Sequence, residues 1–279
     1  MKIGLSLGGG GALGYAHIGV IRALRDADIR IDMANGSSMG AVMAGAYALH
    51  ADIDYISSIV HEMAQCVGVK LFNIFRSGKD ARPFVRGWMA NAICDISLLR
   101  KSILPHSDVV RALEMIFGEN RYSDTRIPFS SVAVDLTSGK IVHINEGKLV
   151  DGILPSVSIP GVFPPVERER QLLSDGSILS DVPIRELKEQ GAEFVIGVKL
   201  GPKASLRYET GFDILNIIET MKEDTIVEWE LEQADFVIDI DIPGMNIFDF
   251  ETSKVAIEAG YQITSKLIPN IQRKLSSHE

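Results

Sequence analysis

The sequence predicts an α/β protein in which a mostly parallel central sheet carries helices on both faces. Short apolar strands alternate with segments of helical periodicity along most of the chain, and two strands lead through glycine-rich turns directly into helices. This alternation is typical of parallel sheets. The 279 residues are 46% hydrophobic, which is enough for a sizeable core, and no linker or internal repeat divides them. We therefore expect a single domain over residues 1–279.

The first two units of the chain have the same order of strand, turn and helix. Residues 2–8 are expected to form a strand, followed by four glycines and a helix from Ala12 to about Arg25. A second strand, Ile31–Asn35, leads through a turn at Gly36–Gly40 into a helix that continues through Leu49. Both turns should lie at the same edge of the sheet if the two strands are adjacent and parallel.

Five further strands and four further helices are expected downstream. The strands are Phe129–Asp135, Lys140–Asn145, Gln171–Leu173, Phe194–Leu200 and Phe236–Ile240. The helices lie near residues 107–117, 182–190, 212–231 and 253–274, so that residues 212–279 are dominated by helix.

Residues 67–105 interrupt this alternation and are expected to form a helical cap inserted into the domain. Between Lys70 and Lys101 there are seven basic and two acidic residues, interleaved with aromatic side chains. Such a pattern suits a flap that touches an anionic lipid surface. It is also typical of an irregular insertion with solvated cations, so both interpretations stay open.

Composition excludes several classes of protein. With 28 basic and 37 acidic residues the net charge is −9, which argues against nucleic acid as a partner. Cys66 and Cys94 have neither the density of a disulfide framework nor the spacing of a zinc site. The apolar start is too short for a signal peptide, and the longest apolar window, Met39–Leu49, is too short to span a membrane. We expect a cytoplasmic protein that can make peripheral contact with the inner membrane face.

The first glycine turn allows two interpretations. Gly9–Gly14 fits the GxGxxG pattern of dinucleotide sites, in which an acid at the end of the second strand holds the ribose. The second strand ends instead in Asn35, and Asp32 lies near its start. A nucleotide-binding module therefore remains only as an alternative.

The second turn carries a candidate nucleophile. Gly36-Ser37-Ser38-Met39-Gly40 is a GxSxG sequence between a strand and a helix, which is the context this motif requires. Glycines on both sides permit the sharp turn that would lift the Ser38 hydroxyl clear of the sheet. An attacking serine creates an oxyanion, which needs fixed N–H donors. The amides of the turn at Gly9–Gly11, together with the amide of Met39, are the candidate donors.

The proton acceptor for Ser38 is less evident from pattern alone. None of the six histidines, His17, His50, His61, His106, His143 and His278, has a catalytic setting. Asp175 follows a strand and precedes Gly176, so its carboxylate could project over the same edge as Ser38, although an ordinary Asp-Gly turn would look the same. Asp181, just before Val-Pro, is interpreted as a helix N-cap rather than as a second acid.

Four motifs, taken in order, resemble those of the patatin-like phospholipases, and of their small bacterial members in particular. They are LGGGGALGYAHIGVI at Leu7–Ile21, GSSMGA at Gly36–Ala41, SVSIPGVFPPV at Ser156–Val166 and DGS at Asp175–Ser177. The resemblance covers the chain to about residue 200. It implies a three-layer α/β/α sandwich and a Ser–Asp dyad without histidine. On that basis Ser38 is the nucleophile, Asp175 the base and Gly9-Gly10-Gly11 the oxyanion hole, with Gly14, Gly36, Gly40 and Gly176 as motif glycines.

Two positions depart from the family pattern. Leu13 stands where Arg or Lys is common, and Ser177 where Gly or Ala is common. Neither replaces a member of the dyad. The expected activity is that of a serine lipid acyl hydrolase acting on phospholipid, lysophospholipid or a simple ester, without cofactor or metal. The alternatives are a nucleotide-binding module and a lipid-surface regulatory protein with a vestigial hydrolase site.

Overall fold

The structure is a computed structural model that describes residues 1–60, 62, 102, 104–201, 211–245, 247 and 250–278. The predicted cap over residues 67–105 lies outside the described residues, apart from 102, 104 and 105. The two cysteines and the basic, aromatic-rich run also lie outside them.

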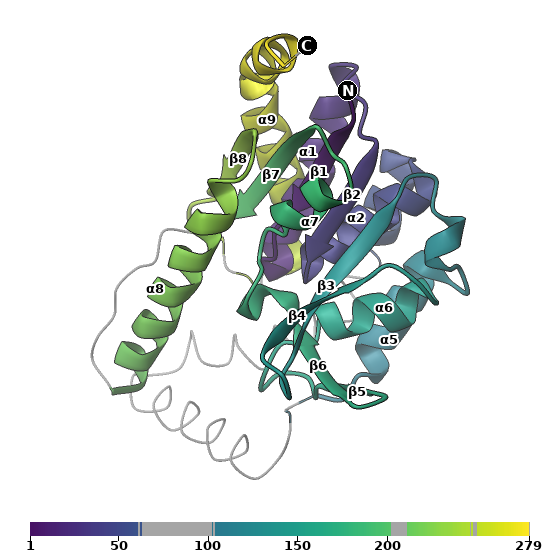
Figure 1. Ribbon diagram of the computed structural model, residues 1–279, viewed down its shortest axis with the longest axis vertical. Coiled ribbons are helices and arrows are strands. Elements are labelled where there is room, and N and C mark those ends of the chain that lie inside the picture. The colour runs from purple at the N-terminus through teal and green to yellow at the C-terminus, as the bar shows by residue number, and fades with distance from the viewer. Residues whose placement is uncertain are drawn as a thin grey trace.

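An eight-stranded sheet forms the centre of the described structure (Figure 1). Its order is β5-β6-β3-β2-β1-β7-β8, with β4 paired to β3. The strands are β1 (Ile3–Leu7), β2 (Met33–Ser37), β3 (Phe129–Asp135), β4 (Lys140–Ile144), β5 (Val166–Arg168), β6 (Gln171–Asp175), β7 (Phe194–Leu200) and β8 (Phe236–Ile240). β3, β2, β1, β7 and β8 run parallel, whereas β4, β5 and β6 pair antiparallel with their neighbours.

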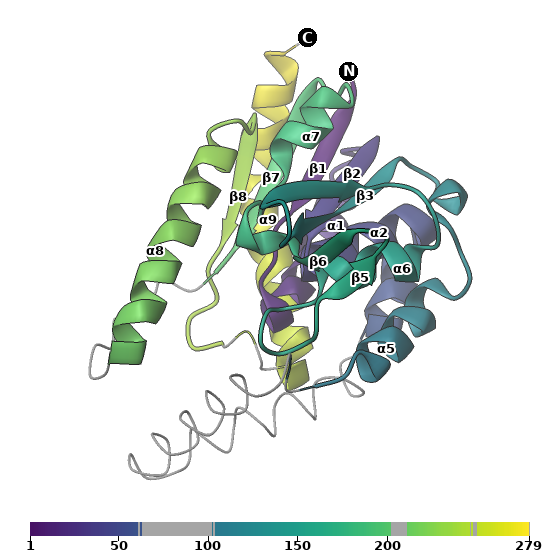
Figure 2. The same cartoon turned by 60° about the horizontal axis from the view of Figure 1, so that its bottom comes forward.

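Helices cover both faces of the sheet, as Figure 2 shows from a second direction. On one face, in the larger hydrophobic core, lie α1 (Ala16–Asp26), α2 (Met39–His50), α5 (Ser107–Phe117), α6 (Leu149–Ser156) and α9 (Ser253–Ser276). The smaller core on the other face joins the sheet to α7 (Ile184–Glu189) and α8 (Gly211–Leu231). The predicted α/β class, with a mostly parallel sheet between helical layers, is therefore confirmed.

The elements agree closely with the sequence prediction, with four differences. The strand β2 begins and ends two residues later than the predicted strand Ile31–Asn35. The strand β5 and the helix α6 were not predicted; α6 contains Pro155, a residue that normally argues against a helix interior. The first helix begins as a 3-10 turn over Gly11–Tyr15 before continuing as α1. None of the helices in the described part of the chain is both long and apolar enough to cross a membrane.

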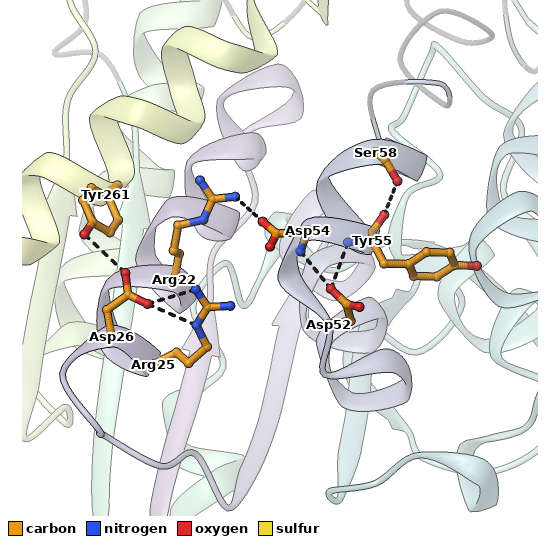
Figure 3. A network of polar contacts seen from close by, with 8 residues as sticks. All are labelled: Arg22, Arg25, Asp26, Asp52, Asp54, Tyr55, Ser58 and Tyr261. Carbon is orange, nitrogen blue, oxygen red and sulfur yellow. Dashed lines mark hydrogen bonds and ion pairs between the residues drawn. The ribbon is translucent and has the colours of Figure 1, made fainter.

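The C-terminal helix α9 packs against α1 and so supports the segment that carries the first glycine turn. A Cβ on Gly260 would overlap the carbonyl oxygen of Ala16, so the two helices approach at backbone distance. Figure 3 shows polar contacts on two sides of α1: the Tyr261 hydroxyl of α9 donates to Asp26 at 3.2 Å, and on the other side Arg22 pairs with Asp54 at 3.1 Å. These surface contacts accompany the packing, whereas the buried helix crossing contributes most of the attraction.

Candidate active site

Ser38 occupies a strained turn between β2 and α2. Its backbone has φ 51 and ψ −124, a conformation that a residue with a side chain adopts only when its surroundings impose it. The surroundings are close backbone contacts: a Cβ on Gly36 would overlap the backbone of Gly40, and one on Gly40 would overlap the carbonyl oxygen of Leu7. The predicted strand-to-helix turn is thus present, and the motif glycines allow its tight packing.

The other two motif glycines, Gly14 and Gly176, also lie at close contacts around this turn. A Cβ on Gly14 would overlap the side chain of Met39, and one on Gly176 would overlap the carbonyl oxygen of Val132. A larger residue at either position would displace the start of α2 or the loop after β6.

Strand register brings Asp175 to Ser38. Ser37, the last residue of β2, pairs with Val132 of β3, and the next residue of β3, Ala133, pairs with Asp175. The Ser38 hydroxyl donates a hydrogen bond to Asp175 Oδ2 at 2.8 Å. The sequence prediction placed Asp175 at the same edge, but β6 reaches that position antiparallel to β3 rather than as another parallel strand.

Burial determines the electrostatics of Asp175, which is 2% exposed. Desolvation raises the pKa of Asp175 to about 6, and hydrogen bonds from Ser177 and Ser38 oppose that rise. The Ser177 hydroxyl and amide donate to Oδ1 at 2.7 and 3.0 Å. A carboxylate with this pKa is still ionised at neutral pH and is a stronger base than an exposed aspartate.

Ser177, one of the two departures from the family pattern, therefore lowers the pKa of Asp175 through its two hydrogen bonds. We expect Ser177→Ala to raise the pKa of Asp175. The substitution removes the hydrogen bond from the Ser177 hydroxyl to the ionised carboxylate, whereas the hydrogen bond from the backbone N–H of residue 177 remains. A bond of this kind contributes about 1.5 kcal/mol, so the acidic limb of kcat/KM should move up by about one pH unit. The measurement is the pH–rate profile with a nitrophenyl ester; an unmoved limb contradicts the assignment.

The glycine turn after β1 lies beside Ser38, since Leu7 pairs with Gly36. Gly10 and Gly11 have φ values of 139 and 55, which favour glycine. Within the part of the chain that the structure describes, the amides of Gly10, Gly11 and Met39 donate to no protein acceptor and remain candidate oxyanion donors. The Gly9 amide differs: it donates to Asp181 Oδ1 at 2.9 Å. The expectation that Gly9 supplies a free donor is corrected accordingly.

Histidine takes no part in the pair. Among the described histidines, none hydrogen-bonds to the side chain of Ser38 or Asp175. His17 is fully buried in α1, and its Nε2 donates to the carbonyl oxygen of Gly8 at 2.8 Å. Burial lowers the pKa of His17 to about 4, so the ring is neutral and supports the glycine turn.

Two residues of the site were not assigned from the sequence. The hydroxyl of Ser156 accepts from the amide of Ser38 at 3.0 Å and so fixes the backbone of the turn. Asp181 was interpreted as a helix N-cap, and that prediction is wrong: α7 begins after Pro183 without a side-chain cap, and Asp181 contacts Gly9 instead. The sequence did hold one signal for Asp181: it follows Asp175 by only six positions, so its side chain had to lie near the same edge of the sheet.

A cavity of about 520 Å³ opens over the pair. The glycine turn, Ser38 and Asp175 form its floor, and α8 lines one wall. Its described lining contains seven carboxyl groups and a single cation, Lys199; the acidic residues are Asp175, Asp181, Glu223, Asp224, Glu228, Asp239 and Asp241. This volume suits a small ligand or the reacting end of a longer one.

Neither a nucleotide site nor a metal site is favoured by the described residues. Asp32 precedes β2 and accepts from the amide of Ile3 at 2.9 Å, so it lies at the edge of the sheet opposite the glycine turn. Asn35 is buried and donates to the carbonyl oxygen of Pro183 at 2.7 Å. No group of three or more His, Cys, Asp or Glu side chains in the described ranges is placed to hold a metal ion.

The fold and this edge of the sheet define an α/β protein with a serine–aspartate pair beside a glycine turn. The chain belongs to the patatin-like phospholipase family, whose family model matches residues 5–188. The resemblance of the four sequence motifs is thereby confirmed.

Individual relatives extend the comparison. The chain is 34% identical over 199 residues to an uncharacterized NTE family protein of Mycobacterium bovis, covering 71% of this chain and 49% of the relative. It is 28% identical over 200 residues to lysophospholipase nte1 of Neurospora crassa, covering 72% of this chain and 12% of that protein. The chain thus spans about half or less of these relatives. VipD from Legionella pneumophila shares the fold, with a TM-score of 0.52 at 17% identity over 96% of this chain and 67% of VipD.

Proposed function

We propose that the protein is a serine lipid acyl hydrolase in which Ser38 and Asp175 form a catalytic dyad. The observation that carries the proposal is the 2.8 Å hydrogen bond from the Ser38 hydroxyl to Asp175, made at a strained turn beside a cavity. Family membership supports a lipid substrate, and the name lysophospholipase of the Neurospora relative points the same way.

In the first half of the proposed reaction, Ser38 Oγ attacks the ester carbonyl carbon and its proton passes to Asp175 Oδ2. The carbonyl oxygen becomes an oxyanion, which the amides of Gly10, Gly11 and Met39 can stabilise. When the tetrahedral intermediate collapses, the bond to the alcohol breaks and Asp175 returns the proton to the departing oxygen. The acyl group then remains on Ser38 as an ester.

In the second half, a water molecule gives a proton to Asp175 and attacks the acyl carbon. Collapse of the new intermediate releases the carboxylic acid, and the proton on Asp175 returns to Ser38. An ester is a better substrate than an amide here, because the alcohol oxygen is the easier leaving group. An amine leaves only after its nitrogen has been protonated. Both nucleophilic attacks, by Ser38 and then by water, use the carboxylate of Asp175 as the base, so activity should rise with pH through about 6.

The charge of the cavity bears on the class of substrate. The described lining contains seven carboxyl groups and one lysine, so its potential is negative even when Asp181 is protonated, and this potential disfavours an anionic head group near the scissile ester. Uncharged esters and lysophospholipids with zwitterionic head groups are the substrates that this lining accommodates best.

A lipid panel tests the proposal. We expect the purified chain to release fatty acid from uncharged nitrophenyl esters and from zwitterionic lysophospholipids, and to act several-fold more slowly on anionic lysophospholipids of the same chain length. The difference should shrink as salt screens the carboxylates. Release of no acid from any ester would contradict the proposed function. Faster hydrolysis of the anionic lipids would contradict only the electrostatic argument.

A further inference from the structure

Asp181 contacts the glycine turn at a point that determines how the turn is placed. Its side chain is 6% exposed, and Oδ1 accepts from the amide of Gly9 at 2.9 Å. Gly9 immediately precedes Gly10 and Gly11, the two residues of the turn whose amides have no protein acceptor in the described part of the chain. On the other side of Gly9, the Gly8 amide donates to the carbonyl oxygen of Val198 at 2.9 Å. The hydrogen bond from Gly9 to Asp181 thus holds the part of the turn that leads into Gly10 and Gly11, the candidate oxyanion donors.

The segment that carries Asp181 is itself fixed by α8. The carboxylate of Glu230 accepts from the Ser180 hydroxyl and, at 2.8 Å, from the amide of Val182. These two donors are the residues on either side of Asp181. A continuous set of hydrogen bonds therefore runs from α8 through residues 180–182 to Gly9.

The charges around Asp181 favour its neutral form. Glu223 and Glu230 face it from α8 and Asp175 faces it from β6, while Lys199 of β7 lines the same cavity. Burial and the nearby Glu223 raise the pKa of Asp181 to about 8. A protonated carboxyl group accepts the Gly9 bond through its carbonyl oxygen and adds no negative charge beside a developing oxyanion.

We propose that Asp181 is a positioning residue, which through its bond to Gly9 holds the glycine turn so that the amides of Gly10 and Gly11 face the oxyanion. This inference rests on the proposed function. It has a consequence for pH dependence. Ionisation of Asp181 places a second negative charge near the reacting ester, so activity should fall as pH rises through about 8.

Two substitutions separate positioning from packing. Asp181→Asn keeps an acceptor for the Gly9 amide and cannot ionise, so kcat at pH 7 should stay within about twofold of the wild type and the alkaline fall should disappear. Asp181→Ala removes the acceptor and should lower kcat by about 10- to 100-fold with KM little changed, as loss of an oriented oxyanion donor does. Asp151→Asn and Asp151→Ala, at an exposed position on α6, are the matched controls.

The rates are compared at a temperature at which all variants are folded by circular dichroism. Any of three kinetic results would overturn the proposal: a wild-type kcat in Asp181→Ala, equal losses of kcat in both Asp181 variants, or a fall in activity at alkaline pH that persists in Asp181→Asn.

A second readout does not depend on activity. The NMR signal of the Gly9 amide should titrate near pH 8 in the wild type and not in Asp181→Asn. Absence of that titration in the wild type would overturn the proposal. A wild type without esterase activity would count against the proposed function instead.

Discussion

Replacing Ser38 by alanine is expected to lower ester hydrolysis by at least about 10³-fold, since it removes the nucleophile and leaves only binding and the oxyanion donors. The fold should be unaffected, because alanine can occupy the same backbone and the hydroxyl hydrogen-bonds only to Asp175 among the described residues. Losing that bond removes a donor from a buried carboxylate, so the pKa of Asp175 should rise further. The measurement is kcat with a short-chain nitrophenyl ester.

Ser37→Ala is the matched control for this substitution. Ser37 is the neighbouring serine, and its hydroxyl is buried without a hydrogen-bond partner in the described structure. Removing an unpartnered hydroxyl should leave both stability and turnover close to those of the wild type. The nucleophile assignment is refuted if Ser38→Ala retains the turnover of Ser37→Ala.

Replacing Asp175 by asparagine is the second large effect that we expect. Asparagine has nearly the same shape, so the strand pairing of β6 with β3 should persist, but its amide cannot take the Ser38 proton. A loss of about 10³- to 10⁴-fold in kcat is expected, with KM changed far less. The dependence of the residual rate on pH around 6 should also disappear, because the group that titrates there is gone.

Labelling with a fluorophosphonate distinguishes the role of Ser38 as nucleophile from that of Asp175 as base. Asp175→Asn keeps the Ser38 hydroxyl and should still react with a fluorophosphonate, though much more slowly than the wild type, whereas Ser38→Ala should not be labelled at all. If kcat of Asp175→Asn remains within tenfold of the wild type, another group must be the base.

Much of the fold follows from local pattern. The parallel strands β1, β3, β7 and β8 are short, mostly apolar runs between recognisable turns, and the structure confirms each of them. The strand β2 is present but lies two residues later than predicted, at Met33–Ser37. β5 lacks such a signal, because it has three residues in a run rich in charge. The helix α6 contains Pro155 and Gly152, and it forms because its apolar residues pack against the core rather than through intrinsic propensity.

The site was predictable only in part, and for a physical reason. Ser38 stands in a motif whose meaning is local, since strand, glycines and helix are consecutive in sequence. The bond between Gly9 and Asp181 joins residues 172 positions apart, and whether an aspartate caps a helix or reaches another loop depends on tertiary packing. The same holds for Ser156, which meets Ser38 across 118 positions. Local pattern therefore indicated Ser38, the family resemblance added Asp175 as its candidate partner, and the structure was needed for the residues that hold the two in place.

The proposed function depends on Ser38 being a nucleophile that Asp175 activates. Its most direct test is to treat the folded wild-type chain with a fluorophosphonate and to locate the adduct by peptide mass spectrometry. We expect one adduct, on Ser38, formed at a rate that rises with pH through about 6. An adduct on another serine, or no adduct on a folded chain that hydrolyses esters, would contradict it.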